Sequence, residues 1–224
     1  MKNKKFIFVT GPSESGKSGG INYIIDNYGD EIKHLKIRNI FPEVYKESNT
    51  DLDFQEWYDY EYQNNFESFW DRYIKKADEM SGDKQVVIMD TMYGVKSIKY
   101  LYSILGNNLG VLYIDADFDK RIFREYTRLR TDSTRSSRKA DLTVTLEDVT
   151  KKTIEKDSSK QKKETFEYRD LVYRNNCIEV GDRNTEEPFS FLIENNGSES
   201  EFHEMLDDYV VNVLLKDKEK RLVK

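Results

Sequence analysis

Residues Gly11-Pro12-Ser13-Glu14-Ser15-Gly16-Lys17-Ser18-Gly19 directly follow a strand-length apolar run at 6–9 and lead into a helical pattern. The first eight match G-x-x-x-x-G-K-[ST], the pattern of a loop whose backbone N–H groups cradle phosphates. A strand, this loop and a helix N-terminus aim several N–H groups at one point, which suits a nucleotide polyphosphate. We therefore predict that residues 11–19 bind a nucleotide, with Lys17 at the β- and γ-phosphates and Ser18 on Mg²⁺. A glycine-rich turn with a solvated lysine is the alternative, which the placement after a strand disfavours.

Further apolar runs predict the rest of a sheet. They lie at 85–89, 110–114 and 189–193, and the first two end at Asp90 and Asp115. Near-continuous apolar runs separated by helical patterns predict an α/β fold, with a parallel sheet covered by helices on both faces. A weaker strand is expected at 34–38. Because ligands bind beyond the carboxyl ends of such strands, the phosphate loop, Arg38, Asp90 and Asp115 are expected at one edge.

Composition favours a single domain in the cytoplasm. A chain of 224 residues can bury one large core. Cys177 is the only cysteine, so no intrachain disulfide can form, and a reducing compartment is expected. We find no signal peptide and no apolar stretch of membrane-spanning length, so no membrane partner is expected. A net charge of −6 makes nucleic acid an unexpected partner but permits a small phosphorylated ligand, because local basic residues decide phosphate binding.

Two inserts are expected within the domain 1–224: a helical insert at 41–80 on the acceptor side, and a lid-like insert at 131–169. In the first, aromatic residues recur at three- and four-residue spacing over 54–77, which predicts one face of a long helix. Core packing is the favoured role, and an aromatic shelf for an acceptor base or ring is the alternative. The aromatic residues are Phe54, Trp57, Tyr58, Tyr62, Phe66, Phe69, Trp70 and Tyr73.

A second helical pattern at 117–130 carries three arginines. Arg121, Arg124 and Arg128 lie at i, i+3 and i+7, so the spacing puts three guanidinium groups on one face. We predict that they clamp phosphate, because the helix leaves the same sheet edge as the phosphate loop. A solvated face with local Glu125 pairing is the alternative.

The lid-like insert is rich in charge and nearly devoid of large apolar residues, so it buries little surface. Thr145 and Asp148 predict the capped start of a weakly packed, mobile helix that runs towards Lys163. A lid is the favoured role, and a disordered linker is the alternative. The later segment 171–181 fits no motif; its periodicity allows a hairpin or an edge strand.

The order of these features resembles the nucleoside monophosphate kinase superfamily of P-loop NTPases. Within it, the chain is most similar to dephospho-coenzyme A kinases and their AAA-family nucleotide-kinase relatives. The likeness rests on the phosphate loop, the Asp-led turn and helix at 90–101, the arginine helix, the charged lid, and the strand, Asn-Asn-Gly-Ser turn and helix at 191–202. Thr91-Met92-Tyr93 replaces the Asp-Gly-Phe-Pro-Arg segment of adenylate kinases, so an ordinary adenylate kinase is not expected.

The resemblance implies a three-layer P-loop fold with a charged mobile lid. It also implies that residues 11–18 bind the donor phosphates and that Arg124 and Arg128 clamp the donor or the transferring phosphate. The turn at 195–198 then lies near the donor base, although Ser198 is equally suited to cap the last helix.

Together these features predict ATP- and Mg²⁺-dependent phosphoryl transfer to a small nucleotide or nucleoside-like acceptor. Asp90 is expected to hold a Mg²⁺ water or to accept a hydroxyl proton, and Arg38 to bind the acceptor's phosphate. Asp115 and Asp117 support the site from outside or cap turns. A nucleotide-gated ATPase or regulatory module, and a kinase of polynucleotide ends or sugar nucleotides, are the alternatives.

Overall fold

The structure is a computed structural model that describes residues 4–90, 94–131, 141–161 and 190–216. Expectations for the Thr91-Met92-Tyr93 segment, for 171–181, for Lys163 and for the lid at 132–140 and 162–169 fall outside these ranges. Within them, no helix combines the length and apolarity needed to cross a bilayer.

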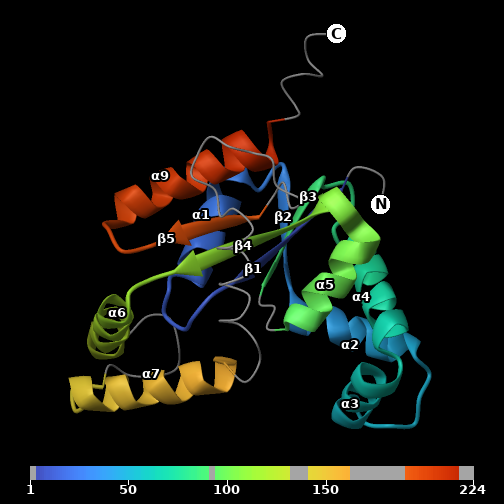
Figure 1. Cartoon of the computed structure of the whole chain (residues 1–224), viewed down its shortest axis with the longest axis horizontal. Coiled ribbons are helices and arrows are strands. Elements are labelled where there is room, and N and C mark those ends of the chain that lie inside the picture. Colours follow the sequence, from blue (N-terminus) through green and yellow to red (C-terminus); the bar gives the residue numbers. More distant parts are fainter. Residues whose placement is uncertain (1–3, 91–93, 132–140, 162–189, 217–224) are drawn as a thin grey trace.

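A five-stranded parallel sheet forms the centre of the molecule, in the order β2-β3-β1-β4-β5 (Figure 1). This confirms the predicted α/β class. β1 lies in the middle, so the loop that follows it opens between the carboxyl ends of β3 and β4. The strands are β1 (Lys5–Thr10), β2 (Ile32–Lys36), β3 (Val86–Asp90), β4 (Leu109–Asp115) and β5 (Phe191–Glu194).

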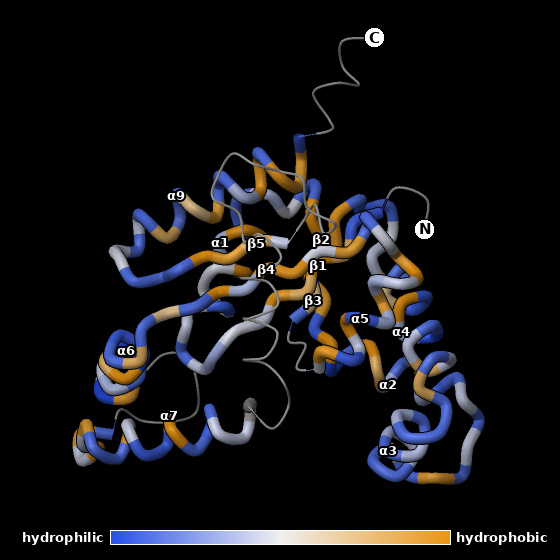
Figure 2. Tube along the Cα trace, viewed as in Figure 1, coloured by the Kyte–Doolittle hydropathy of each residue, from blue (hydrophilic) through white to orange (hydrophobic). Residues whose placement is uncertain are grey.

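Helices cover both faces of the sheet, which makes three layers (Figure 1). Successive side chains of β1 alternate between the faces, as strand geometry requires. Phe6 and Phe8 pack against α2 (Ile37–Glu47), α4 (Phe66–Met80) and α5 (Val95–Leu105). Ile7 and Val9 pack against α1 (Lys17–Tyr28) and α9 (Glu199–Tyr209). The central strands are accordingly the most hydrophobic part of the trace (Figure 2).

The aromatic segment differs from the prediction of one long helix. It forms α3 (Phe54–Asn64) and α4, which are separated at Asn65, where φ is −127° and ψ is 33°. Asp53 and Glu56 form a capping box that starts α3. Core packing is confirmed for the aromatic residues that are buried: Trp57, Phe69, Trp70 and Tyr73.

The predicted strand at 34–38 is displaced, because β2 ends at Lys36 and α2 begins at Ile37. Arg38 therefore lies on the first turn of a helix. The predicted helix capped by Thr145 and Asp148 is confirmed as α7 (Leu146–Gln161), since the Asp148 N–H donates to Thr145 Oγ1 at 3.1 Å.

α7 packs on α6 (Phe118–Thr131) through a small cluster of Ile122, Val144 and Val149. Apart from this seam α7 is mostly hydrophilic (Figure 2). A short 3₁₀ turn (Gly106–Asn108) leads into β4, and a π-helical turn (Val210–Leu214) continues α9.

Candidate active site

The loop after β1 has a backbone that only glycine permits at two places. Gly11, Glu14 and Gly16 have φ angles of 135°, 61° and 102°. A Cβ on Gly11 would lie 2.1 Å from the Ile114 carbonyl oxygen, and a Cβ on Gly16 would lie 2.4 Å from Asn195 Nδ2. The glycines of the motif are therefore required both by their left-handed conformation and by the close approach of β4 and of the turn after β5.

Lys17 begins α1 directly after this loop. Its Nζ donates to the Pro12 carbonyl oxygen and lies 3.4 Å from Ser15 Oγ, so the side chain folds back over its own loop. Ser18 and Gly19 are exposed on the first turn of α1. The cationic head of Lys17, the Ser18 hydroxyl and the helix N-terminus thus share one end of α1.

This arrangement fits a nucleotide polyphosphate with Mg²⁺. Gly11 and Gly16 give the cradle its left-handed turns, and the N-terminus of α1 favours negative charge. No three His, Cys, Asp or Glu side chains of the described ranges gather to hold a metal by themselves. A Mg²⁺ ion bound largely by substrate phosphates, with Ser18 and Asp90 nearby, needs no such cluster.

Asp90 ends β3 beside the phosphate loop, because it pairs in register with Val9 of β1. On its other side lies β2, and His34 Nε2 is 3.2 Å from Asp90 Oδ1. That nitrogen is buried, and although it is close to the carboxylate the contact lacks hydrogen-bond geometry. The sequence pointed to Asp90 but not to His34, because nothing in a lone histidine on an edge strand shows which carboxylate the sheet register will bring to it.

Arg38 lies on the same side of the sheet but is exposed. It makes no hydrogen bond or ion pair with any other residue that the structure describes. Acceptor binding by Arg38 stays a prediction.

The three arginines of α6 have three different environments, which the expectation of one shared face did not foresee. Arg121 is buried, and its Nε and Nη1 donate to the carbonyl oxygens of Ala116 and Ser13, each at 3.2 Å. Arg128 is half exposed and pairs with Glu125 through Nε at 2.7 Å, which is the local pairing of the alternative interpretation.

Arg124 lies between Arg121 and Arg128 on α6. Its Nη2 donates to the carbonyl oxygen of Asn195 at 2.8 Å and to Oδ1 of the same residue at 3.1 Å. Its Nη1 is buried without a hydrogen-bond partner within the described ranges, and burial lowers the pKa of the guanidinium. Phosphate clamping by Arg124 and Arg128 stays a prediction.

α7, the described helix of the lid-like insert, contacts α6 and the phosphate loop through ion pairs. Asp157 Oδ2 lies 2.8 Å from Arg121 Nη1, and the pair is buried. Lys156 Nζ lies 3.3 Å from Glu14 Oε1 in the loop and 3.6 Å from Glu125 Oε1 on α6. Residues about 140 positions apart in the chain thus place the insert directly on the candidate site.

The turn after β5 is hydrogen-bonded to the segment that follows β4. Asn196 Oδ1 accepts a hydrogen bond from the Asp117 N–H at 2.7 Å, and Asp115 Oδ1 accepts one from the Ala116 N–H at 2.9 Å. Turn capping therefore describes Asp115. Ser198 forms a capping box with Glu201 at the start of α9, which confirms its role as an N-cap.

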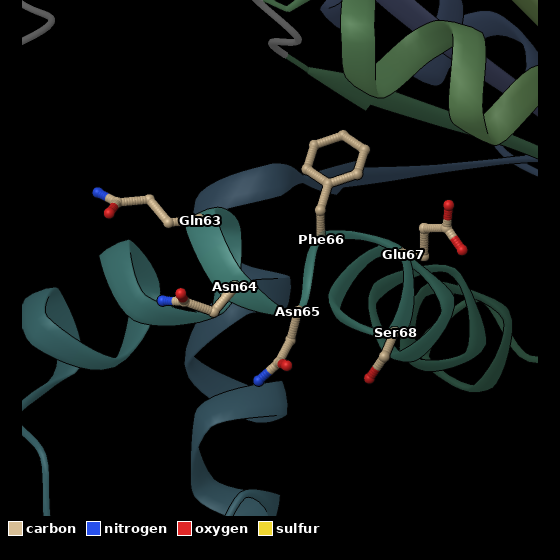
Figure 3. Close-up of a pocket in the computed structure, with 6 residues that line it drawn as sticks. All are labelled: Gln63, Asn64, Asn65, Phe66, Glu67 and Ser68. Carbon is tan, nitrogen blue, oxygen red and sulfur yellow. The ribbon is translucent and has the colours of Figure 1, made fainter.

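A shallow depression of about 380 Å³ lies apart from these residues, where α3 meets α4 (Figure 3). Its lining comes from one short stretch of chain, and Phe66 points towards α5 while Gln63 points away from it. Lys96 Nζ lies 3.9 Å from the centre of the Phe66 ring. None of the charged residues of the candidate site lines this depression, so the depression is not part of that site. The lining residues are Gln63, Asn64, Asn65, Phe66, Glu67 and Ser68.

Two rings bear on the alternative, an aromatic shelf, and one of them lies near Gly94 at the start of α5. Tyr58 and Tyr62 of α3 are stacked, with ring centres 6.1 Å apart and planes at 10°. The Tyr62 hydroxyl lies close to Gly94, where a Cβ would be 3.7 Å away. A shelf for an acceptor stays a prediction.

Comparison with known proteins finds no match in sequence and distant matches in structure. No protein-family model and no curated protein sequence matches the chain. Solved structures with a similar trace include a sugar kinase from Janibacter sp. HTCC2649 (12% identity, 94% of each chain, TM-score 0.44). They also include shikimate kinase from Acinetobacter baumannii in complex with shikimate (15% identity, 95% of this chain and 94% of the other, TM-score 0.42). An uncharacterized protein from Eubacterium ventriosum ATCC 27560 has 11% identity over 92% of this chain and 98% of its own, with a TM-score of 0.47. Similarities at this level say nothing about activity, and the fold assignment rests on the strand order and the phosphate loop.

Proposed function

We propose that the protein is a P-loop kinase that transfers a phosphoryl group from Mg·ATP to a small nucleotide or nucleoside-like acceptor. The observation that carries the proposal is the juxtaposition at the centre of the sheet. A glycine cradle with Lys17 at its end follows β1, and Asp90 lies at the end of the neighbouring strand β3, in register with Val9. Charge neutralisation and positioning, which phosphoryl transfer requires, are what these residues offer.

Each residue of the site would have a role in phosphoryl transfer that fits its position. When bound, Mg·ATP would supply the phosphoryl group and a divalent charge. Lys17 would leave the Pro12 carbonyl oxygen for the more negative donor phosphates, and the loop N–H groups would hold the same phosphates. Ser18 would bind the metal ion. Asp90 would hold a metal-bound water or take the proton of an acceptor hydroxyl.

A second candidate function is a nucleotide-gated module. The ion pair between Lys156 of α7 and Glu14 of the phosphate loop favours it, because α7 then responds directly to the state of the loop. Such a module hydrolyses ATP slowly, and no small acceptor stimulates that hydrolysis.

An acceptor screen tests the proposal. ATP consumption is measured with nucleosides, nucleotides and dephospho-coenzyme A, in the wild type, in Lys17→Ala and in Lys75→Ala. Lys75 is an exposed lysine of α4 and controls for the loss of one positive charge. We expect one acceptor class to stimulate consumption, with turnover lower by about 10²–10³ in Lys17→Ala, as when one preorganised charge-stabilising donor is removed, and unchanged in Lys75→Ala. Hydrolysis that no acceptor stimulates would favour the gated module, and equal rates in a folded Lys17→Ala variant would contradict both functions.

A further inference from the structure

Asn195 joins the phosphate loop to the turn after β5. The residue is only 6% exposed. Its N–H donates to the Asp115 carbonyl oxygen at the end of β4, at 2.8 Å. Its Nδ2 donates to the Ser15 carbonyl oxygen, at 2.9 Å and across 180 positions of sequence. One residue therefore connects β4 through its backbone, and the middle of the loop through its side chain, to the turn after β5.

The bond to Ser15 bears on the conformation of the loop. Ser15 is fully buried, and a buried carbonyl oxygen requires a donor. A loop that turns its N–H groups inward to phosphates must turn some carbonyl oxygens outward, and Asn195 satisfies one of these. Without that donor, the loop conformation that turns the Ser15 carbonyl oxygen towards Asn195 is no longer favoured over other conformations.

The orientation of the Asn195 amide is itself determined by its neighbours. Arginine has only donors, so the amide oxygen faces Arg124 Nη2, at 3.1 Å, and the amide nitrogen must face Ser15. Arg124 Nη2 also donates to the Asn195 carbonyl oxygen, at 2.8 Å. The space beside the amide is available because Gly16 has no Cβ, which would lie 2.4 Å from Asn195 Nδ2.

We propose that Asn195 is a positioning residue that holds the phosphate loop in its nucleotide-binding conformation, and that Arg124 holds Asn195. Neither role needs contact with a substrate. The inference rests on the proposed function only in that the loop binds nucleotide phosphates. It adds a residue from the far end of the chain to the machinery of that loop.

The test compares Asn195→Asp with Asn196→Asp. Asn195→Asp keeps an acceptor for Arg124 but removes the donor to Ser15. Asn196→Asp adds the same charge one residue away and keeps the oxygen that accepts from the Asp117 N–H. Asn195→Ala removes the donor without adding charge.

We expect the Kd for a fluorescent ADP analogue to rise by about tenfold or more in Asn195→Asp and Asn195→Ala, which matches the loss of one buried hydrogen bond, and by less than about threefold in Asn196→Asp. In steady-state assays KM for ATP is expected to rise while kcat at saturating ATP changes much less, because the loop is repositioned by binding. Wild-type affinity in both Asn195 variants would overturn the inference and leave the proposed function intact.

Hydrogen exchange of the free protein tests the role of Asn195 separately from the proposed function. Amides of the segment 11–20 are expected to exchange about tenfold faster in both Asn195 variants and at the wild-type rate in Asn196→Asp. If the wild type binds no nucleotide, the proposed function fails, and exchange still decides whether Asn195 orders the loop. Arg124→Met, which removes the donors that hold Asn195, should speed exchange in the same segment by a smaller factor. Unchanged exchange in all folded variants would overturn the inference.

Discussion

Gly19 and Gly20 offer a matched pair of substitutions on neighbouring positions of α1. Two glycines so early in a helix are unfavourable, since each costs about 1 kcal/mol relative to alanine. The structure explains only one of them. A Cβ on Gly19 would meet nothing within 4 Å, whereas a Cβ on Gly20 would lie 2.9 Å from Phe202 Cζ and 3.3 Å from Leu206 Cδ1 of α9.

The difference between the two variants follows from these distances. Both substitutions gain the same helix propensity of about 1 kcal/mol, so this contribution cancels in the comparison. Carbon atoms pack best at about 3.5–4.0 Å, so Gly20→Ala must displace Phe202 or Leu206, both of which are buried. Overpacking of this kind costs about 1–3 kcal/mol. We therefore expect Gly19→Ala to be more stable than the wild type, and Gly20→Ala to be about 1–3 kcal/mol less stable than Gly19→Ala.

Urea denaturation measures this difference, with an unchanged m-value as the sign that only stability has altered. For a domain of this size the melting temperatures should differ by about 2–4 °C for each kcal/mol. Phe202→Leu should destabilise the Gly20→Ala protein less than it destabilises the wild type, because it removes the ring that the new methyl group meets. Equal stabilisation by both alanines would refute the close approach of α1 and α9.

Three further perturbations test the site and its surroundings. Asp90→Asn should lower activity. Added Mg²⁺ should restore much of the rate if Asp90 organises the metal, and should fail to do so if Asp90 is a general base. Full activity of the variant at every Mg²⁺ concentration would remove Asp90 from the site. Asp157→Asn leaves Arg121 buried without its counter-charge, so trypsin should cut α7 faster than in the wild type; equal cleavage rates would show that this ion pair does not hold α7 on α6. Burial and then the hydrogen bond to Asp207 raise the pKa of Tyr28 from 10 to about 12, so the folded state keeps a proton that the unfolded state loses, and stability should fall from about pH 10 to 12. Tyr28→Phe should make that fall shallower in denaturation experiments, and an identical pH profile would contradict the assignment.

Asp90 and His34 show which site residues local sequence patterns can predict and which they cannot. Asp90 could be predicted, because an apolar run that ends in a carboxylate places it at the carboxyl edge of a parallel sheet. His34 could not, because its contact with Asp90 depends on the register of β2 against β3. Likewise, periodicity predicted buried aromatics at 54–77, but the break at Asn65 depends on how α3 and α4 pack against each other and against α2.

The sequence by itself determined the phosphate loop, the strands of the sheet and the capped helix at Thr145, because each depends on residues that are neighbours in the chain. Their signals are periodicity, turn chemistry and side-chain hydrogen bonds over a few positions. Only the tertiary structure decided that Asn195 supports Ser15, that Asp157 pairs with Arg121, and that the arginines of α6 differ in environment. Those contacts join segments that are far apart in sequence, and they form only when the strand order brings the ends of β1, β4 and β5 together.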